Sequence, residues 1–297
     1  MTLTVYLPLL MALPLTFAAH WIAARAVPGP VVWTLTITAT VAAACSTWSL
    51  GLLTLTMLDD VPPLKTLDDH PTLELPEPVP GPVALVAGLL LLGAGLRLLL
   101  DVRRRTTTNR RLREVGTVQD GLVIADWSAP LAVAVPGRPR RPGHLLLTTG
   151  ILRALDAQER RVVVAHEQAH LRHRHHRLTA AAGAAAALNP LLIPVRNTVT
   201  FLVERWADED AAAEVGDRDL AAAAVARAAL ATGAGPPTAL GIDGGALVQR
   251  VRALAAPAPA ARLRRLAGPI LLSAAFLAVA VLVTVQFVAL ATAWLSA

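Results

Sequence analysis

Four long apolar stretches divide the chain, at residues 3–24, 31–58, 83–100 and 270–295. Each approaches or exceeds the roughly 20 residues that an α-helix needs to cross the hydrocarbon core of a bilayer. The first stretch has no basic segment before it and leads almost directly into the second, so we expect a retained helix and not a cleaved signal peptide. The pattern predicts a multi-pass membrane protein with four transmembrane helices.

The region between the third and fourth stretches is expected to form one domain of moderate size. Its first part contains short apolar runs separated by Gly and Pro, which predict a small β-sheet of two to four strands. Its later part contains longer periodic segments, which predict helices. The expected strands lie at 122–125, 130–135 and 144–148, and the expected helices at 156–178, 220–231 and 248–254. Two further helices are expected between 178 and 215, the second of which carries Glu204.

We therefore expect a mainly α-helical membrane protein with an α+β domain outside the bilayer. The expected parts are 1–111 with three transmembrane helices, 112–261 as the domain, and 262–297 with a basic linker and the fourth transmembrane helix. The domain's first long helix should begin at a capping box, in which the side chains of Asp156 and Glu159 each bond the other residue's backbone N–H.

Composition and charge fit this plan. The chain is 55% hydrophobic and only 16% charged, and its net charge is +6. Arg residues cluster after the third stretch and before the fourth, which by the positive-inside rule places the domain in the cytoplasm and both termini outside. The loop at 59–82 is acidic and rich in Pro, as suits an extracytoplasmic linker. Because the basic excess flanks the spans and no nucleic-acid motif is visible, we expect contact with anionic lipids and not with nucleic acid.

Cys45 is the only cysteine and lies inside the second apolar stretch. A single cysteine excludes an intrachain disulfide and a cysteine-based zinc finger. We expect Cys45 to act as a small apolar packing residue.

The chain contains His166-Glu167-Gln168-Ala169-His170, which is the HExxH pattern of zinc-dependent hydrolases. On a helix, residues four apart share one face, so His166 and His170 can hold a single metal ion. Glu167 can reach a water molecule on that ion and act as the general base. Downstream, Glu204 in the pattern ExxAD can supply the third protein ligand of a catalytic zinc site.

Other polar residues near these motifs have less defined roles. Asp208 lies one turn after Glu204 and is expected to bond the free N–H of a ligand histidine; a solvated acidic surface is the alternative. We expect His173, His175 and His176 to be solvated basic residues, although extra metal ligands remain the alternative. The residue that would stabilise an oxyanion is not identified by the sequence.

The stretch at 178–203 is apolar enough to resemble a fifth span. If it crossed the membrane, His170 and Glu204 would lie on opposite sides and could not share a metal ion. Asn189-Pro190 also interrupts the run. We therefore expect two helices bent at Asn189-Pro190, buried in the domain or resting on the membrane surface. A re-entrant hairpin that returns to the same side is the alternative.

The order of these motifs resembles the integral-membrane gluzincins, and in particular the BlaR/MecR-type metallopeptidases, with HtpX-type and CAAX-prenyl-type proteases as more distant relatives. The elements that carry the resemblance are Thr148-Thr149-Gly150-Ile151-Leu152, the HExxH helix, Leu188-Asn189-Pro190-Leu191 and Glu204-Arg205-Trp206-Ala207-Asp208. The resemblance implies one zinc ion on His166, His170 and Glu204, with Glu167 as the base. β-Lactam sensors of this type carry a penicillin-binding domain after the fourth span, which we do not expect here.

The expected function is that of a zinc endopeptidase at the cytoplasmic face of the cell membrane. Its substrate would be a protein, either a regulatory protein such as a repressor or a damaged membrane protein. A non-catalytic membrane module that binds zinc for structure or signalling is the alternative. The sequence does not indicate the oligomeric state.

Overall fold

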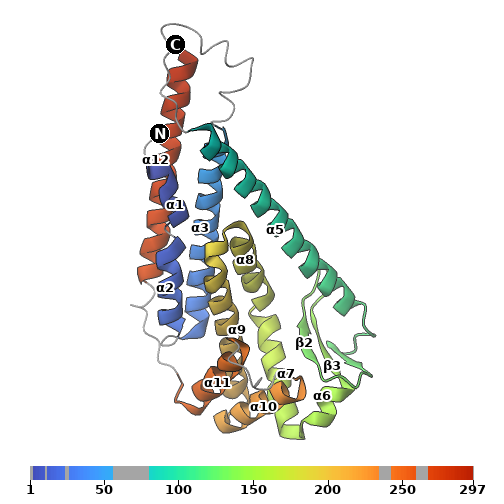
Figure 1. Cartoon of the computed structure of the whole chain (residues 1–297). Helices are drawn as coiled ribbons and strands as arrows, with labels where there is room; N and C mark the ends of the chain where they lie inside the picture. The colour runs from blue at the N-terminus through green and yellow to red at the C-terminus, as the bar shows by residue number, and fades with distance from the viewer. Residues whose placement is uncertain are drawn as a thin grey trace.

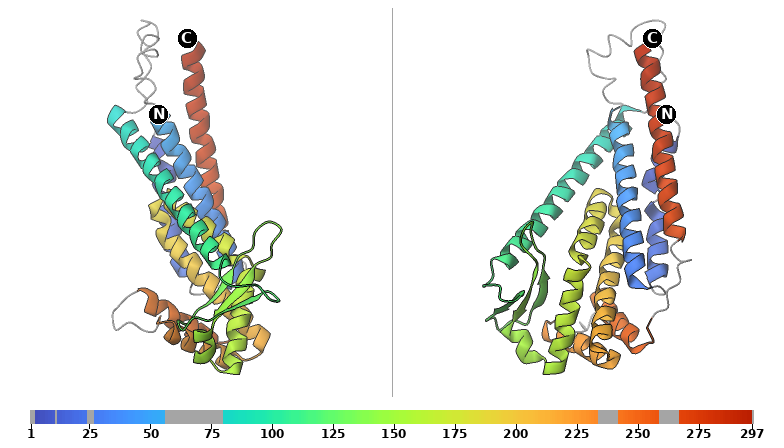
Figure 2. Two further views of the ribbon diagram at one scale, coloured as in Figure 1. Left: turned by 90° about the vertical axis from the view of Figure 1, so that its right-hand side faces the viewer. Right: turned by 180° about the vertical axis from the view of Figure 1, so that it is seen from behind.

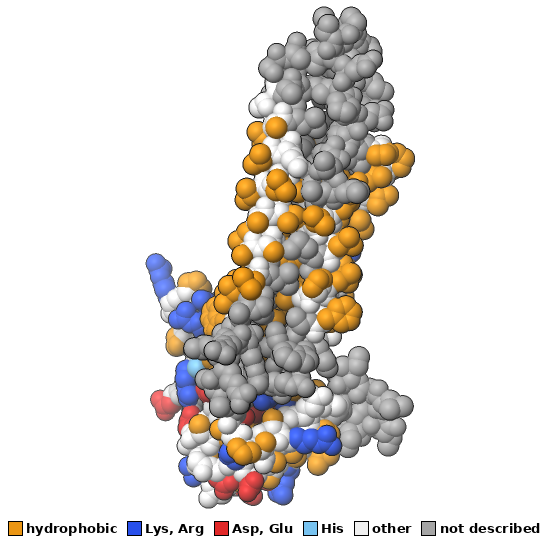
Figure 3. Space-filling view, turned by 90° about the vertical axis from the view of Figure 1, so that its left-hand side faces the viewer, with side chains coloured by type: hydrophobic (Ala, Val, Ile, Leu, Met, Phe, Trp, Pro, Cys, Tyr) orange, Lys and Arg blue, Asp and Glu red, His pale blue; other side chains and the backbone are white. Residues whose placement is uncertain are grey.

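The computed structural model describes residues 3–10, 12–23, 27–55, 80–233, 242–258 and 267–296. The chain is mostly helical, with one small mixed sheet. Long helices form a column, and a domain built from the sheet and shorter helices lies at one end of it (Figure 1). Apolar side chains cover the column, whereas charged side chains gather on the domain (Figure 3).

Two of the described helices are long and apolar enough to cross a membrane: α3 (Pro28–Leu55) and α5 (Gly81–Arg113). The other two expected spans correspond to α1 (Leu7–Leu10) with α2 (Ala12–Ala23), after the short helix η1 (Leu3–Tyr6), and to α12 (Ala267–Ser296). Their apolar stretches are shorter, at Leu7–Phe17 and Ser273–Gln286. The predicted acidic loop falls almost entirely, at 59–79, outside the described residues, as do residues 262–266 of the basic linker.

Hydrogen bonds between side chains join α12 to α3. Thr38 and Ser273 share a bond of 2.7 Å between their hydroxyl oxygens, and the indole N–H of Trp48 donates to Thr284 Oγ1 at 2.7 Å. Cys45, as expected, is a buried packing residue in the apolar cluster that α3 shares with α2, α8, α9 and α12. Among the expected spans, α2, α3 and α12 therefore pack on a common core.

The sheet contains the three strands that the apolar runs predict: β1 (Leu122–Ala125), β2 (Ala132–Val135) and β3 (His144–Thr148). Their order is β1-β3-β2, with β1 parallel and β2 antiparallel to the central β3. Every residue of β3 is buried, as befits a strand covered on both faces. Within the described residues, one edge of β2 has no neighbouring strand.

After the sheet come α6 (Thr149–Ala154) and α7 (Ala157–Arg172). The predicted capping box of Asp156 and Glu159 is present at the start of α7. The prediction that this helix continues to residue 178 is wrong, because Arg174 adopts a left-handed conformation with φ of 53° and a new helix begins at His175. His173 holds the break in place: its Nε2 lies 2.6 Å from Asp210 Oδ2, and its ring stacks on Trp206 at 4.3 Å.

The apolar stretch at 178–203 forms a hairpin of α8 (His175–Leu188), η3 (Pro190–Leu192) and α9 (Ile193–Val215), so the predicted bend at Asn189-Pro190 is confirmed. Asn189 caps the turn by accepting a bond from the backbone N–H of Leu191. The two ends of the hairpin meet, since the rings of His175 and Trp206 lie 4.9 Å apart. The stretch therefore leaves the domain and returns to it, alongside α3 (Figures 1 and 2).

The remaining helices, α10 (Arg218–Ala231) and α11 (Ile242–Ala255), lie below α9 in Figure 1. They pack on α7 and α9 through small apolar residues, including Ala211, Ala221 and Leu254. This layer brings residues far along the sequence close to the HExxH helix.

Candidate metal centre

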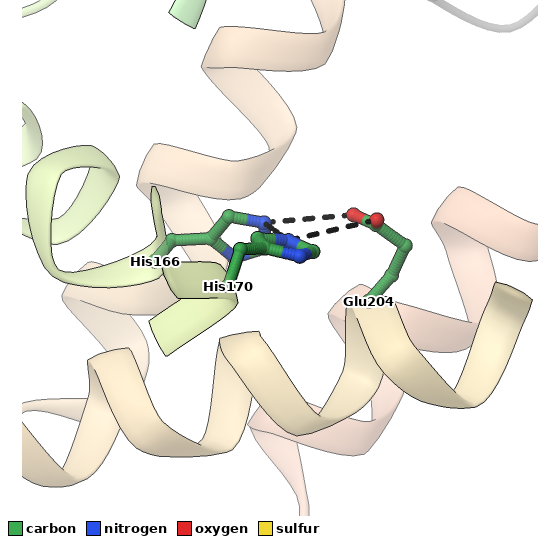
Figure 4. A group of neighbouring side chains, drawn as sticks. All are labelled: His166, His170 and Glu204. Atoms are coloured by element: carbon green, nitrogen blue, oxygen red, sulfur yellow. Dashed lines mark hydrogen bonds and ion pairs between the residues drawn. The ribbon is translucent and has the colours of Figure 1, made fainter. Parts of the chain in front are cut away.

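Three predicted ligands converge between α7 and α9. His166 and His170 lie one turn apart on α7, and the carboxylate of Glu204 faces them from α9 (Figure 4). The two Nε2 atoms are 3.1 Å apart, and the Glu204 oxygens lie 3.5 Å from His166 Nε2 and 3.6 Å from His170 Nε2. Helix α7 forms here because its capping box fixes its start and because Val162, Ala165 and Ala169 give it a buried face.

The donor atoms fit a zinc ion. Zinc–ligand distances of about 2.0–2.1 Å in a tetrahedron place the ligand atoms about 3.3 Å from one another, and the observed separations are 3.1 to 3.6 Å. Two imidazole nitrogens and a carboxylate oxygen are donors that zinc accepts readily. The Glu204 side chain is 35% exposed, and a catalytic zinc site keeps its fourth position for water or substrate.

Asp208 lies one turn after Glu204 and is almost completely buried. Its Oδ1 is 3.0 Å from Nδ1 of His166, an ion-pair contact that is oblique to the ideal hydrogen-bond direction. Nδ1 is the ring nitrogen that faces away from Glu204. The carboxylate is thus positioned to hold the His166 ring with its Nε2 lone pair directed at the metal position.

Arg250, on α11, completes the charged cluster. Its Nε and Nη2 each lie 2.7 Å from an oxygen of Asp208, and its Nη1 lies 3.3 Å from Glu204 Oε2. Arg250 was not predicted from the sequence, because it is one of many Arg residues and lies in the predicted helix 248–254, far along the chain from both motifs. A signal would have required knowing that α11 packs against α9.

Glu167 is partly buried next to the same cluster. Burial, together with the neighbouring Glu204 carboxylate, raises its pKa, and the charge of His166 opposes this rise. The backbone N–H of Ala134 on β2 lies close enough to favour its ionised form. The side chain therefore occupies the space between the HExxH helix and the free edge of the sheet.

The charges of the ligand residues affect one another strongly. Burial opposes protonation of His166, but its contacts with Asp208 and Glu204 outweigh burial and raise its pKa to about 10. Burial lowers the pKa of His170 to about 4. The pKa of Glu204 is lowered despite its burial, because His166, His170 and Arg250 stabilise the carboxylate. The carboxylates of Asp208 and Glu204 thus favour a positive charge on His166, whereas burial disfavours one on His170.

The three additional histidines differ from one another. His176 is exposed, as predicted, whereas His175 is only 1% exposed, so the prediction of a solvated residue is wrong there. Nδ1 of His175 lies 3.1 Å from Nδ1 of His170. Burial lowers the pKa of His175 to about 3. His173 is partly buried against Asp210 and Trp206, away from the three converging ligands.

Comparison with known proteins identifies one family. The model of peptidase family M48 matches residues 113–268, which is more than half of the chain. The match covers the sheet, the converging ligands and Arg250. Neither a curated protein nor a solved structure gives a significant match.

Proposed function

The chain belongs to peptidase family M48, whose members are zinc metallopeptidases, and from this premise we propose that it is a membrane-bound endopeptidase with one zinc ion on His166, His170 and Glu204. The observation that carries the proposal is the convergence of these three side chains, whose donor atoms all lie within 4.8 Å of one another. The order of the motifs along the chain supports an enzyme of the BlaR/MecR type.

In the proposed reaction, a bound zinc ion would supply Lewis acidity for the scissile carbonyl and acidify the attacking water. Glu167 takes the proton of that water and passes it to the leaving amine. Asp208 orients the His166 ring, and Arg250 holds Asp208 and Glu204 in place through its ion pairs. This division of roles gives a part to Glu167, Asp208 and Arg250 beside the three proposed ligands.

The free edge of β2 supports a peptide as the substrate. The backbone N–H of Thr148 on β3 donates to the carbonyl of Leu131. Alternate residues of a strand direct their backbone groups to opposite edges, so those of Ala132 and Ala134 point away from β3. The backbone N–H of Ala134 lies next to Glu167. An extended peptide that pairs with this edge would pass beside the proposed base. A protein segment, for example of a repressor, is the substrate class we propose.

Metal content tests the proposed site directly. Purified protein should contain about one zinc ion per chain, and His170→Ala or Glu204→Ala should lower this to background, because two ligands hold a zinc ion far less tightly than three. Elemental analysis after gel filtration measures the ratio. His176→Ala is the matched control, since it removes an exposed imidazole six residues away and should keep the zinc ion. Equal zinc content in the His170→Ala and His176→Ala proteins would contradict the assignment.

We further propose that α1 with α2, α3, α5 and α12 cross the cell membrane and that the peptidase domain is cytoplasmic. Supporting this, α5 exposes a series of large apolar side chains, among them Leu89 at 61% and Leu92 at 73%. The apolar surface of the column in Figure 3 fits hydrocarbon better than water. The Arg residues that continue α5 toward the domain suit the anionic inner leaflet.

In this arrangement the α8–α9 hairpin is re-entrant. Asn189 at its tip donates to Ser46 Oγ at 3.1 Å, and Ser46 in turn donates to the carbonyl of Pro8 at 3.0 Å. Ser46 lies 18 residues beyond Pro28 in α3, about 27 Å along a helix. Arg196 lies near the tip of the hairpin, and its guanidinium donates to Asn197 Oδ1 at 2.9 Å. In a re-entrant hairpin this charged group must reach water or lipid headgroups.

Cysteine labelling tests the depth of the hairpin. In a Cys45→Ala background, Leu191→Cys at the tip should resist a membrane-impermeant maleimide in inside-out vesicles and react after detergent is added. Arg161→Cys on the exposed face of α7 is the control and should react in intact vesicles. Labelling of both positions at similar rates in intact vesicles would place the tip in water and exclude a re-entrant hairpin.

A further inference from the structure

His175 contacts the nitrogen of His170 that the metal position leaves free. His170 directs Nε2 toward His166 and Glu204, so Nδ1 carries the ring hydrogen whenever Nε2 binds a metal ion. The atom opposite this Nδ1, at 3.1 Å, is Nδ1 of His175. A hydrogen bond from His170 to His175 is the arrangement that satisfies both nitrogens at this distance.

The proposed contact requires one particular tautomer of His175. To accept the bond, Nδ1 of His175 must be unprotonated, which leaves the hydrogen on Nε2. Nε2 is buried, and among the described residues it has no hydrogen-bond partner. A second hydrogen on Nδ1 would face the N–H of His170 directly. The neutral Nε2–H form therefore fits the site.

We propose that His175 is a positioning residue: its Nδ1 accepts the His170 Nδ1–H and thereby fixes the ring orientation and tautomer that bind zinc. The inference rests on the proposed zinc site. Ligand histidines usually have a carboxylate or carbonyl partner, as His166 has in Asp208. A second neutral imidazole performs this task without adding charge.

The charges of the cluster explain why a neutral partner suits His170. Three carboxylates, those of Glu167, Glu204 and Asp208, surround the metal position, and Arg250 supplies one positive charge. A bound zinc ion adds two, which makes the cluster neutral. A fourth carboxylate at position 175 would leave an uncompensated negative charge in a buried place, at considerable cost.

The fold holds the His175 ring rigidly. The left-handed turn at Arg174 directs the first residue of α8 back under His170. The Trp206 ring lies 4.9 Å from the His175 ring and itself rests on Gly29 in the first turn of α3. A Cβ atom at position 29 would come within 3.0 Å of the indole carbons, so only glycine permits this approach without a shift. His175 is thus fixed between the metal centre and an apolar helix.

Two substitutions of similar size test the proposal. His175→Asn keeps a polar atom at the place of Nδ1, whereas His175→Leu has the same branching and no acceptor. We expect the zinc dissociation constant, measured by competition with a fluorescent chelator, to rise about 10- to 100-fold for His175→Leu. For His175→Asn it should stay within about threefold of the parent. His176→Leu, at the exposed neighbour, is the control and should not change zinc affinity.

The outcomes separate this inference from the proposed function. If the parent binds no zinc, the proposed function fails; if the parent and His175→Leu bind it equally, only the role of His175 fails. Thermal unfolding of the metal-free variants identifies a loss of folding. Should His175→Leu fail to fold, His175→Gln replaces it, because the Gln amide reaches the place of Nε2 and not Nδ1. Zinc affinity of His175→Gln equal to that of His175→Asn would then overturn the proposal.

Discussion

Glu167→Gln should keep one zinc ion per chain and lose peptide hydrolysis, with a fall in kcat of about 10²- to 10⁴-fold. The substitution preserves the size of the side chain and removes its ability to accept a proton. Glu167 is not among the converging ligands, so the metal position at His166, His170 and Glu204 stays intact. Zinc content by elemental analysis and hydrolysis of fluorescently labelled casein, with a candidate repressor as second substrate, measure the two properties separately.

The matched control is Glu214→Gln, on α9, which makes the same chemical change at a partly exposed residue paired with Arg172. It should leave both zinc content and hydrolysis unchanged. If the parent hydrolyses protein and Glu167→Gln does so at the same rate, the enzymatic role of this residue is wrong. If neither protein hydrolyses anything while both hold zinc, the non-catalytic zinc module becomes the better description.

The parts of the site that the sequence predicted correctly are those encoded over short distances. His166 and His170 share a helix face because of their spacing, and the capping box at Asp156 and Glu159 depends only on residues three apart. The three strands were recognisable because each is a short apolar run between Gly and Pro residues. These features require no knowledge of the tertiary structure.

Features that depend on packing between distant elements were not predictable in the same way. The helix break after Arg172 follows from contacts of His173 with Trp206 and Asp210 on another helix. Burial of His175 follows from the same packing, although its neighbours in sequence are charged. The return of the α8–α9 hairpin could be inferred only from the requirement that Glu204 reach the histidines. Its packing beside α3, where Asn189 donates to Ser46, has no signal in the sequence.

Arg250 is the clearest case of a residue that only the fold reveals, and its removal should have the largest effect on stability. Arg250→Met keeps the length and apolar stem of the side chain but leaves Asp208 and Glu204 without their guanidinium. Breaking a buried ion pair by removing one partner typically costs about 3–5 kcal/mol, because an uncompensated charge stays buried. For a domain of this size we expect the melting temperature of the metal-free protein to fall by on the order of 10 °C.

The loss should be smaller in the zinc-bound protein, because the two charges of the ion compensate the same carboxylates. By linkage, Arg250→Met should then bind zinc at least as tightly as the parent while its metal-free form is less stable. Thermal unfolding in detergent, with and without saturating zinc, measures both effects. Arg252→Met, an exposed position on the same helix, is the control and should change the melting temperature little.

The double variant Asp208→Asn with Arg250→Met should be more stable than the sum of the two single losses implies. The reason is that removing either charge is costly mainly while the opposite charge remains. Strict additivity, or equal destabilisation with and without zinc, would show that Arg250 does not act through the charges of the metal centre.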